Sequence, residues 1–251
     1  MKDKYLNQHA ESIHKNLDAW ESKPLLRRLY RTFHQTIAEV ALPPEAGITV
    51  ELGSGIGTIT DTISHCIRTD TFPHPRIDKV ESAYSLSFDD STVANIILFD
   101  VFHHLRYPGT ALREFQRVLI PGGRVIIFEP CLSLLGLLVY GVLHDEPLQL
   151  REPITWLAPP GWNHQEDPYY AAQGNAFRAF CVEQADGALS EWEIIHKHRY
   201  SAISYVASGG YSKAQLYPEF LYPLMKGVDS ICDLLPSLFA TRLLVVLRRS
   251  D

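Results

Sequence analysis

The chain has 251 residues, of which 46% are hydrophobic, enough for one domain with a sizeable core, so a disordered chain is excluded. Its formal net charge of -6 excludes a generally basic surface, and we expect a small partner and no nucleic acid. The four cysteines lie far apart with no Cys-x-x-Cys pair, which indicates neither a zinc knuckle nor a disulfide scaffold and favours a cytoplasmic protein.

The first residues, Met1 to Lys4, lead into a polar stretch without the apolar segment of a secretory signal, so we expect no export. The most apolar window runs from Cys131 to Leu143 and contains two glycines. It is about 13 residues long, short of the roughly 20 that cross a bilayer. The sequence predicts no transmembrane segment and leaves open whether residues 132–143 touch a membrane surface.

Strands and helices alternate along the first half of the chain. Apolar residues spaced three and four apart predict amphipathic helices, and short β-branched runs predict strands. The expected helices are residues 25–42, a helix after Gly57 and residues 108–119. The expected strands are residues 48–52, 66–70, 79–81, 95–100 and 124–128. This alternation predicts right-handed crossovers and a parallel sheet covered on both faces.

The pattern changes beyond residue 130. An apolar helix over residues 132–143 precedes a Pro- and aromatic-rich stretch, residues 151–180, that has no periodicity and is expected to form a cap or lid. Two further strands, residues 193–204 and 241–249, flank a helical segment over residues 213–235. The predicted fold class is α/β: a Rossmann-like, doubly wound, mostly parallel seven-stranded sheet with helices on both faces. One domain spans residues 1–251, with a core at about 45–130, the cap at about 131–190 and the terminal strands at about 191–251.

A glycine cluster, Gly53-Ser-Gly55-Ile-Gly57, follows the first strand, where open parallel sheets bind their ligands. Glycine admits positive φ and close backbone approach. A dinucleotide fingerprint would place its third glycine where Thr58 stands. A nicotinamide-dependent oxidoreductase is therefore an alternative that Thr58 disfavours.

Four ordered motifs share one half of the chain. They are Glu51-Leu-Gly-Ser-Gly-Ile-Gly57, Asp70 at the end of the second strand, Phe99-Asp-Val-Phe-His-His-Leu105, and Leu119-Ile-Pro-Gly-Gly-Arg124. Over about residues 48–130 the chain resembles the class I S-adenosylmethionine-dependent methyltransferases, in the methyltransferase type 11-like group. More loosely, Leu143-His-Asp-Glu-Pro147 and Ser208-Gly-Gly-Tyr211 resemble one bacterial subset of that group.

The resemblance implies S-adenosyl-L-methionine as cofactor and methyl transfer to a small-molecule, glycan or lipid-intermediate acceptor. The glycines would approach the methionine portion and Asp70 would bond the ribose hydroxyls. Where the family often has Asp-Ala to hold the adenine amino group, this chain has Ser82-Ala83. The expected cofactor-binding residues are Glu51, Gly53, Ser54, Gly55, Gly57, Asp70, Ser82, Ala83, Asp100 and Val101. A second departure is the short stretch from Gly57 to Asp70, which leaves one to two helical turns.

A methyl acceptor that is an oxygen or nitrogen must lose a proton, and a neutral imidazole can take it. His104 is the first candidate for this base and His103 the second, the alternative being a structural or positioning role for the pair. The candidate acceptor-binding residues are His144, Glu146, Trp156 and Tyr169. The alternative for the His144 motif is that it caps the preceding helix and pins the lid.

No metal site is predicted, because His196-x-His198 would need further ligands beside it. A third interpretation keeps cofactor binding but no catalysis, as in a regulatory or partner protein. Neither the oligomeric state nor the acceptor atom follows from the sequence.

Overall fold

The computed structural model describes residues 2–144, 146–166, 170–183, 187 and 189–250. One seven-stranded sheet runs in the order β3-β2-β1-β4-β5-β7-β6, with β7 antiparallel to both neighbours and the other pairs parallel. The strands are β1 Ile48–Leu52, β2 Ile67–Asp70, β3 Lys79–Val80, β4 Val93–Phe99, β5 Leu119–Pro130, β6 Trp192–Tyr200 and β7 Arg242–Arg249. The predicted mostly parallel α/β sheet is confirmed.

Both faces of the sheet are buried. Successive strand residues point to opposite faces, so Ile97 on β4 packs with Phe33 of helix α2 (Pro24–Glu39) on one side. Its neighbour Ile96 packs with Phe115 of helix α3 (Pro108–Val118) on the other side. The continuous apolar runs of β4, β5 and β7 therefore follow from burial on two faces.

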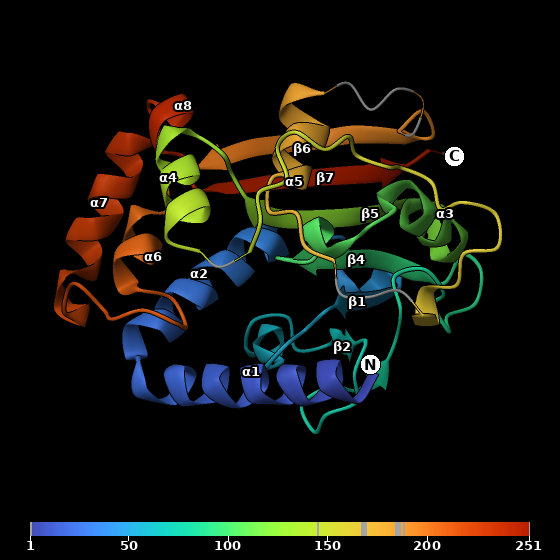
Figure 1. The fold of residues 1–251 in the computed structure, drawn as a ribbon, viewed down its shortest axis with the longest axis horizontal. Coiled ribbons are helices and arrows are strands. Elements are labelled where there is room, and N and C mark those ends of the chain that lie inside the picture. Colours follow the sequence, from blue (N-terminus) through green and yellow to red (C-terminus); the bar gives the residue numbers. More distant parts are fainter. Residues whose placement is uncertain (1, 145, 167–169, 184–186, 188, 251) are drawn as a thin grey trace.

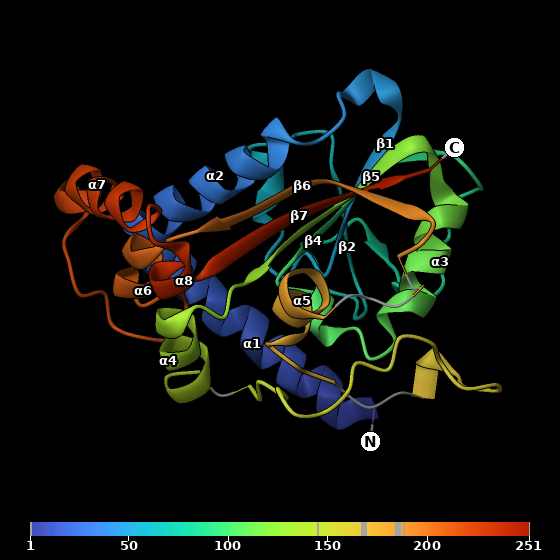
Figure 2. The ribbon, with the colours of Figure 1, turned by 90° about the horizontal axis from the view of Figure 1, so that it is seen from above.

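Four helices gather at one end of the sheet (Figures 1 and 2). They are α4 Leu134–Val142, α6 Ile203–Ser208, α7 Tyr222–Cys232 and α8 Pro236–Phe239. The predicted helix over residues 132–143 is α4, and the segment over residues 213–235 contains α7. Several of their leucine and isoleucine side chains are exposed. None of the helices in the described ranges has both the length and the apolar character needed to cross a membrane.

Shorter helical turns complete the connections. Single 3-10 turns are η1 Pro44–Ala46, η2 Thr58–Asp61, η3 Phe102–His104, η4 His164–Glu166 and η6 Glu219–Leu221, and α5 Asn175–Phe177 continues into the π-helical turn Arg178–Val182. In the described parts of the expected lid stretch, residues 151–166 and 170–180, the regular structure consists of η4, α5 and the start of the π-helical turn.

The β1–β2–β3 side differs from the prediction. The expected helix after Gly57 is only the turn η2, because the stretch between β1 and β2 is too short to cross the sheet as a helix and return. The sequence analysis did not predict helix α1 (Lys2–Ser22), which runs alongside β2 (Figure 1). Among the α1 side chains from residue 9 onward, whose burial the structure describes, Ile13 and Ala19 are buried. The β2 side of the sheet is therefore flanked by a mostly polar helix.

Candidate active site

The glycine loop follows β1 at the carboxyl edge of the sheet. Gly53, Gly55 and Gly57 have φ of 65°, 52° and 68°, the left-handed region that favours glycine. A Cβ on Gly53 would lie 2.6 Å from Cγ2 of Val101, and one on Gly57 would lie 2.5 Å from the carbonyl oxygen of Arg76. A Cβ on Gly55 would meet nothing within 4 Å. Packing therefore requires the outer two glycines, whereas the middle one borders open space.

Hydrogen bonds join the glycine loop to β2. The Ser54 amide donates to the carbonyl of Thr69 (2.8 Å), and the Thr69 amide donates to Oγ of Ser54 (3.1 Å). Glu51 lies beneath this loop with a side chain that is almost fully buried, and burial raises the pKa of Glu51 to about 8. Its Oε2 is buried without a hydrogen-bond partner. The loop is thus rigidly placed, with one unsatisfied carboxyl oxygen below it.

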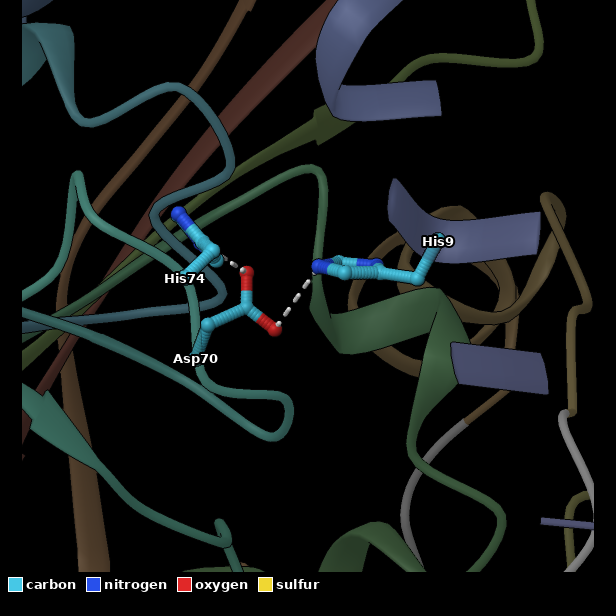
Figure 3. A group of neighbouring side chains, drawn as sticks. All are labelled: His9, Asp70 and His74. Carbon is cyan, nitrogen blue, oxygen red and sulfur yellow. Dashed lines mark ion pairs between the residues drawn. The ribbon is translucent and has the colours of Figure 1, made fainter. Parts of the chain in front are cut away.

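Asp70, the last residue of β2, faces the glycine loop. Its Oδ2 accepts from the Gly55 amide (3.3 Å) and its Oδ1 accepts from the Thr71 amide (2.7 Å). Two imidazoles lie close to the same carboxylate: Nε2 of His9 is 3.6 Å from Oδ1, and Nε2 of His74 is 3.8 Å from Oδ2 (Figure 3). The predicted ribose acid is therefore directed toward the loop but has neighbours that the sequence did not predict.

Ser82 and Ala83 stand where the family holds the adenine. The Ser82 hydroxyl accepts from the amide of Tyr84 (3.3 Å), within a tight turn that pairs Ser82 with Ser85. Ala83 packs against the hydrophobic core. In this structure, both residues serve the local turn and packing.

Asp100, which follows β4, pairs with a cation of its own chain. Its φ is 56°, and its carboxylate accepts from Nη1 of Arg242 on β7. The Arg242 side chain is only 2% exposed and its guanidinium lies against the rings of Phe33, Phe99, Phe128 and Tyr205. Asp100 retains 32% exposure of its side chain. The ion pair thus places the buried charge of Arg242 next to the carboxyl end of β4.

His103 is held between two carboxylates. Its Nδ1 lies 2.6 Å from Oε2 of Glu129, a fully buried residue near the end of β5, and its Nε2 lies 3.4 Å from Oε2 of Glu146. Burial alone would lower the pKa of His103, but the charge and hydrogen bond of Glu129 and the bond with Glu146 raise it to about 10. The side-chain amide of Gln173 also donates to the carboxylate of Glu146. The two carboxylates therefore favour the imidazolium form of His103.

His104, adjacent in sequence, has the opposite protonation state. Burial, and then the charge of His103, lower the pKa of His104 to about 4. Its Nδ1 is 2.9 Å from the carbonyl oxygen of Tyr170, which can only accept, so Nδ1 carries the proton. Nε2 then presents a lone pair, 3.9 Å from Oε1 of Glu146. The geometry thus produces one charged and one neutral imidazole with ring centres 4.1 Å apart.

Contacts through Val101 connect this histidine pair to the glycine loop. The His104 amide donates to the carbonyl of Val101 (2.9 Å), whose side chain lies where a Cβ on Gly53 would be. The loops after β1 and after β4, which carry the two groups of predicted residues, are therefore adjacent. This is expected because β1 and β4 are neighbours at the point where the strand order reverses, which is where open α/β sheets bind their ligands.

The predicted acceptor residues are divided. Glu146 joins the histidine pair, whereas His144 is exposed and its Nδ1 accepts from the Glu146 amide (3.3 Å). Trp156 lines a different cavity of about 550 Å³, beside α3. Tyr169 lies outside the described residues. Of the three acceptor candidates that the structure describes, it brings Glu146 to the histidines.

Sequence reasoning missed Glu129, Gln173 and Arg242. Glu129 was detectable, because it lies at the carboxyl end of a strand, as Asp70 and Asp100 do. Gln173 lies in the aperiodic lid stretch, and Arg242 begins a strand whose alternation gave no sign of a buried cation.

Comparison with known proteins decides the kind of domain. Residues 50–127 match the sequence model of the family described as methyltransferase domain. Residues 50–127 of the chain are therefore a methyltransferase domain that depends on S-adenosylmethionine. The cofactor of this domain is S-adenosyl-L-methionine. No curated protein matches the chain.

Solved structures share the fold at low sequence identity. A methyltransferase from Thermotoga maritima is 14% identical, with 95% of this chain and 99% of that chain covered and a TM-score of 0.52. Geranyl diphosphate methyltransferase, solved with its cofactor, is 10% identical, with 88% and 86% covered and a TM-score of 0.52. A methyltransferase from Methanococcus maripaludis is 18% identical, but the match spans only 45% of this chain and 61% of that chain, with a TM-score of 0.36. At these identities the likeness shows the methyltransferase fold.

The residues at the glycine loop fit this cofactor. The space beside Gly55 is open, the Asp70 carboxylate is directed to that loop, and Oε2 of Glu51 is a buried acceptor without a partner. Backbone amides and carboxylates are the groups that bind an amino-acid end and ribose hydroxyls. At its ribose end, S-adenosyl-L-methionine would contact an Asp70 carboxylate that already has His9 and His74 beside it.

Proposed function

We propose that the methyltransferase domain transfers a methyl group to an oxygen or nitrogen atom of a small-molecule acceptor, with His104 as the base. The observation that carries this proposal is the unequal set of contacts of the adjacent imidazoles: two carboxylates, Glu129 and Glu146, contact His103, whereas Nδ1 of His104 bonds the carbonyl of Tyr170. These contacts favour a neutral His104 beside the cofactor loop, and a positioned neutral imidazole can accept a proton from an acceptor.

S-adenosyl-L-methionine supplies the methyl group as part of a sulfonium. The glycine loop would hold its amino-acid end, with Ser54 fixing the loop to β2 and Glu51 beneath it. Asp70 would accept the ribose hydroxyls, and Ser82 and Ala83 would border the adenine. Val101 and Asp100 would line the methyl end, because they join the loop to the histidine pair.

His104 is suited to receive the acceptor's proton at Nε2. The carbonyl of Tyr170 holds the other ring proton on Nδ1, so the lone pair stays on Nε2. Glu146, 3.9 Å from that nitrogen, would stabilise the imidazolium that forms. His103 is a positioning residue in this scheme: it orients Glu146 and keeps His104 neutral before the transfer.

The lid stretch supports a small acceptor. Backbone bonds fasten it to the histidine pair, since the Ala172 amide donates to the carbonyl of His103 (3.0 Å) and the Gln173 amide donates to that of Pro147 (3.0 Å). A cover bonded this closely favours a compact acceptor over a polymer. Geranyl diphosphate methyltransferase, which has the same fold, is named for a small acceptor.

The test combines cofactor calorimetry with product detection. Purified protein is titrated with S-adenosylhomocysteine and then assayed for its release from S-adenosylmethionine against panels of small hydroxyl and amine compounds, glycans and lipid-linked intermediates. With a small acceptor, His104→Ala should lower kcat by about 10²–10⁴-fold and leave the affinity for S-adenosylhomocysteine unchanged.

The matched control is His198→Ala, which removes an exposed imidazole from β6 and should leave kcat unchanged. Full activity of His104→Ala would refute the base. Turnover only with glycans or lipid-linked compounds would refute the small acceptor. Tight binding of S-adenosylhomocysteine without turnover on any panel would favour the non-catalytic alternative.

A further inference from the structure

Three side chains from separate segments converge beside the glycine loop. His9 comes from α1, Asp70 from the end of β2 and His74 from the β2–β3 connection (Figure 3). One ligand atom of each lies within 4.8 Å of the others. Asp70 and His74 are almost fully buried, with side chains 7% and 9% exposed. The His9 side chain is 25% exposed, so the cluster lies half-buried where α1 meets the end of β2.

The spacing within the cluster does not suit direct hydrogen bonds. Nε2 of His9 and of His74 lie 3.6 Å and 3.8 Å from the Asp70 oxygens, beyond the usual 3.2 Å limit for nitrogen and oxygen. Both Nε2 atoms are buried without a hydrogen-bond partner. Buried polar atoms without a partner are uncommon, and binding of an ion is one of the roles that explain them.

Asp70 does not need the histidines to be satisfied. Its two oxygens already accept from the amides of Thr71 and Gly55. By contrast, Asp78 in the same connection makes a direct 2.7 Å ion pair with Arg68. The two histidines therefore approach the carboxylate at ion-pair distance, from two separate segments of the chain.

We propose that His9, Asp70 and His74 form a zinc site. Tetrahedral zinc with bonds of about 2.0–2.1 Å places its ligand atoms roughly 3.4 Å apart. The three ligand atoms lie within 4.8 Å of one another, so the side chains would close around the ion to reach this spacing. Two imidazoles and one carboxylate are a typical zinc ligand set that leaves the fourth position open. Zinc on Nε2 of His74 puts the ring proton on Nδ1, so the 3.3 Å contact from the Arg76 amide to Nδ1 would be lost.

A second cluster, His103, His104 and Glu146, offers ligand atoms at similar spacing but does not carry the same inference. Its histidine nitrogens already have close partners. Nδ1 of His103 lies 2.6 Å from Glu129, and Nδ1 of His104 donates to Tyr170. That cluster is a connected hydrogen-bond network, whereas the His9 cluster has unused imidazole nitrogens.

Zinc would compete with the cofactor. This consequence rests on the proposed role of Asp70 in ribose binding, because one carboxylate would serve both ligands. Zinc would also join α1 to β2 across the ribose end of the site. By linkage, zinc would weaken cofactor binding by the same factor by which the cofactor weakens zinc binding.

The first measurement needs no cofactor. The full chain is dialysed against chelator-buffered Zn²⁺ and the bound metal is counted by elemental analysis. We expect one zinc ion per chain, and a loss of affinity of at least about 100-fold in His9→Ala and in His74→Ala, since even outer contacts of a metal site are worth 10–100-fold. Far-UV circular dichroism confirms that the variants fold.

The control is His14→Ala, which removes an exposed imidazole from the same helix and should leave zinc binding unchanged. Because four free cysteines could take up metal, Co²⁺ substitution provides an independent readout: the spectrum should lack a thiolate charge-transfer band. Absence of bound zinc, or equal binding by His9→Ala and His74→Ala, would overturn the site.

Competition is measured separately, by titrating S-adenosylhomocysteine with and without saturating Zn²⁺. A weaker apparent affinity in the presence of zinc supports competition, and an unchanged affinity refutes it. A protein that binds zinc but not S-adenosylhomocysteine would contradict the proposed function and leave the zinc site standing.

Discussion

The two halves of the sheet's carboxyl edge treat buried polar groups differently. At the ends of β4 and β5, Asp100 pairs with Arg242, and Glu129 and Glu146 enclose His103. At the ends of β1 and β2, Oε2 of Glu51 and Nε2 of His9 and His74 have no hydrogen-bond partner. On the β4–β5 side Nε of Arg242 and Oε1 of Gln173 also lack one, but there each charged group has a direct ionic partner. Paired charges hold their groups in one geometry, so we propose that the first half orients reactive groups and that the second half receives small ligands.

If this contrast holds, substitutions in the two halves should fail in different ways. Changes at the β4–β5 side should lower stability, because they leave a buried charge uncompensated. Changes at the β1–β2 side should lower ligand affinity at little cost to stability.

The largest effect is expected for Asp100→Asn. The substitution leaves the guanidinium of Arg242, which is 2% exposed, without its carboxylate. We expect the free energy of unfolding to fall by about 3–5 kcal/mol, measured by urea denaturation. Glu193→Gln breaks an exposed pair with Arg248 on the same strand β7 and should cost less than about 1 kcal/mol. Equal losses of unfolding free energy for the two variants would show that the buried pair contributes no more to stability than the exposed one.

The next effect concerns Glu129→Gln, which removes the charge beside His103. We expect a loss of about 2–3 kcal/mol of stability at pH 6, the value of a hydrogen bond to a charged group. Because the folded pKa of His103, about 10, exceeds its unfolded value, this contribution is complete below pH of about 6.5 and is lost as the pH rises toward 10.

Two measurements check the Glu129 prediction. Unfolding curves from pH 6 to 10 should converge for the two proteins as the pH rises. NMR titration should show that the His103 ring loses its proton at lower pH in Glu129→Gln. Parallel stability curves would mean that Glu129 does not hold His103 charged.

The smallest stability effect and a selective binding effect are expected for Gly55→Ala. Its positive φ should cost about 1 kcal/mol, as in Gly122→Ala, because neither Cβ would meet an atom within 4 Å. Only Gly55→Ala fills space beside Asp70. Only this variant should therefore lower the affinity for S-adenosylhomocysteine, by roughly tenfold or 1.4 kcal/mol. Equal affinities of the two variants would place the cofactor elsewhere.

Much of the sheet was predictable, because its strands are buried on both faces and read as continuous apolar runs. The residues that follow β1, β2 and β4 were predictable for the same reason: the carboxyl ends of parallel strands meet at one edge. This rule brought Gly53, Asp70 and His103 to one edge of the sheet, and applied to β5 it would also have found Glu129.

Contacts made by the lid and by α1 were not predictable. Gln173 lies in a stretch without periodicity, so nothing in the sequence indicates which strand it meets. His9 lies on a mostly polar helix, and a helix without a clear apolar face gives little sign of where it packs. The zinc ligand set therefore emerges only when α1 is placed beside β2.

The pairing of Asp100 with Arg242 has an evolutionary consequence. An acid at position 100 without a base at position 242, or the reverse, leaves one charge without its partner. An evolutionary intermediate with a single change is therefore less stable. Among descendants of a common ancestor, these two positions should be replaced together, and a lineage that retains only one of them should carry a compensating change close by.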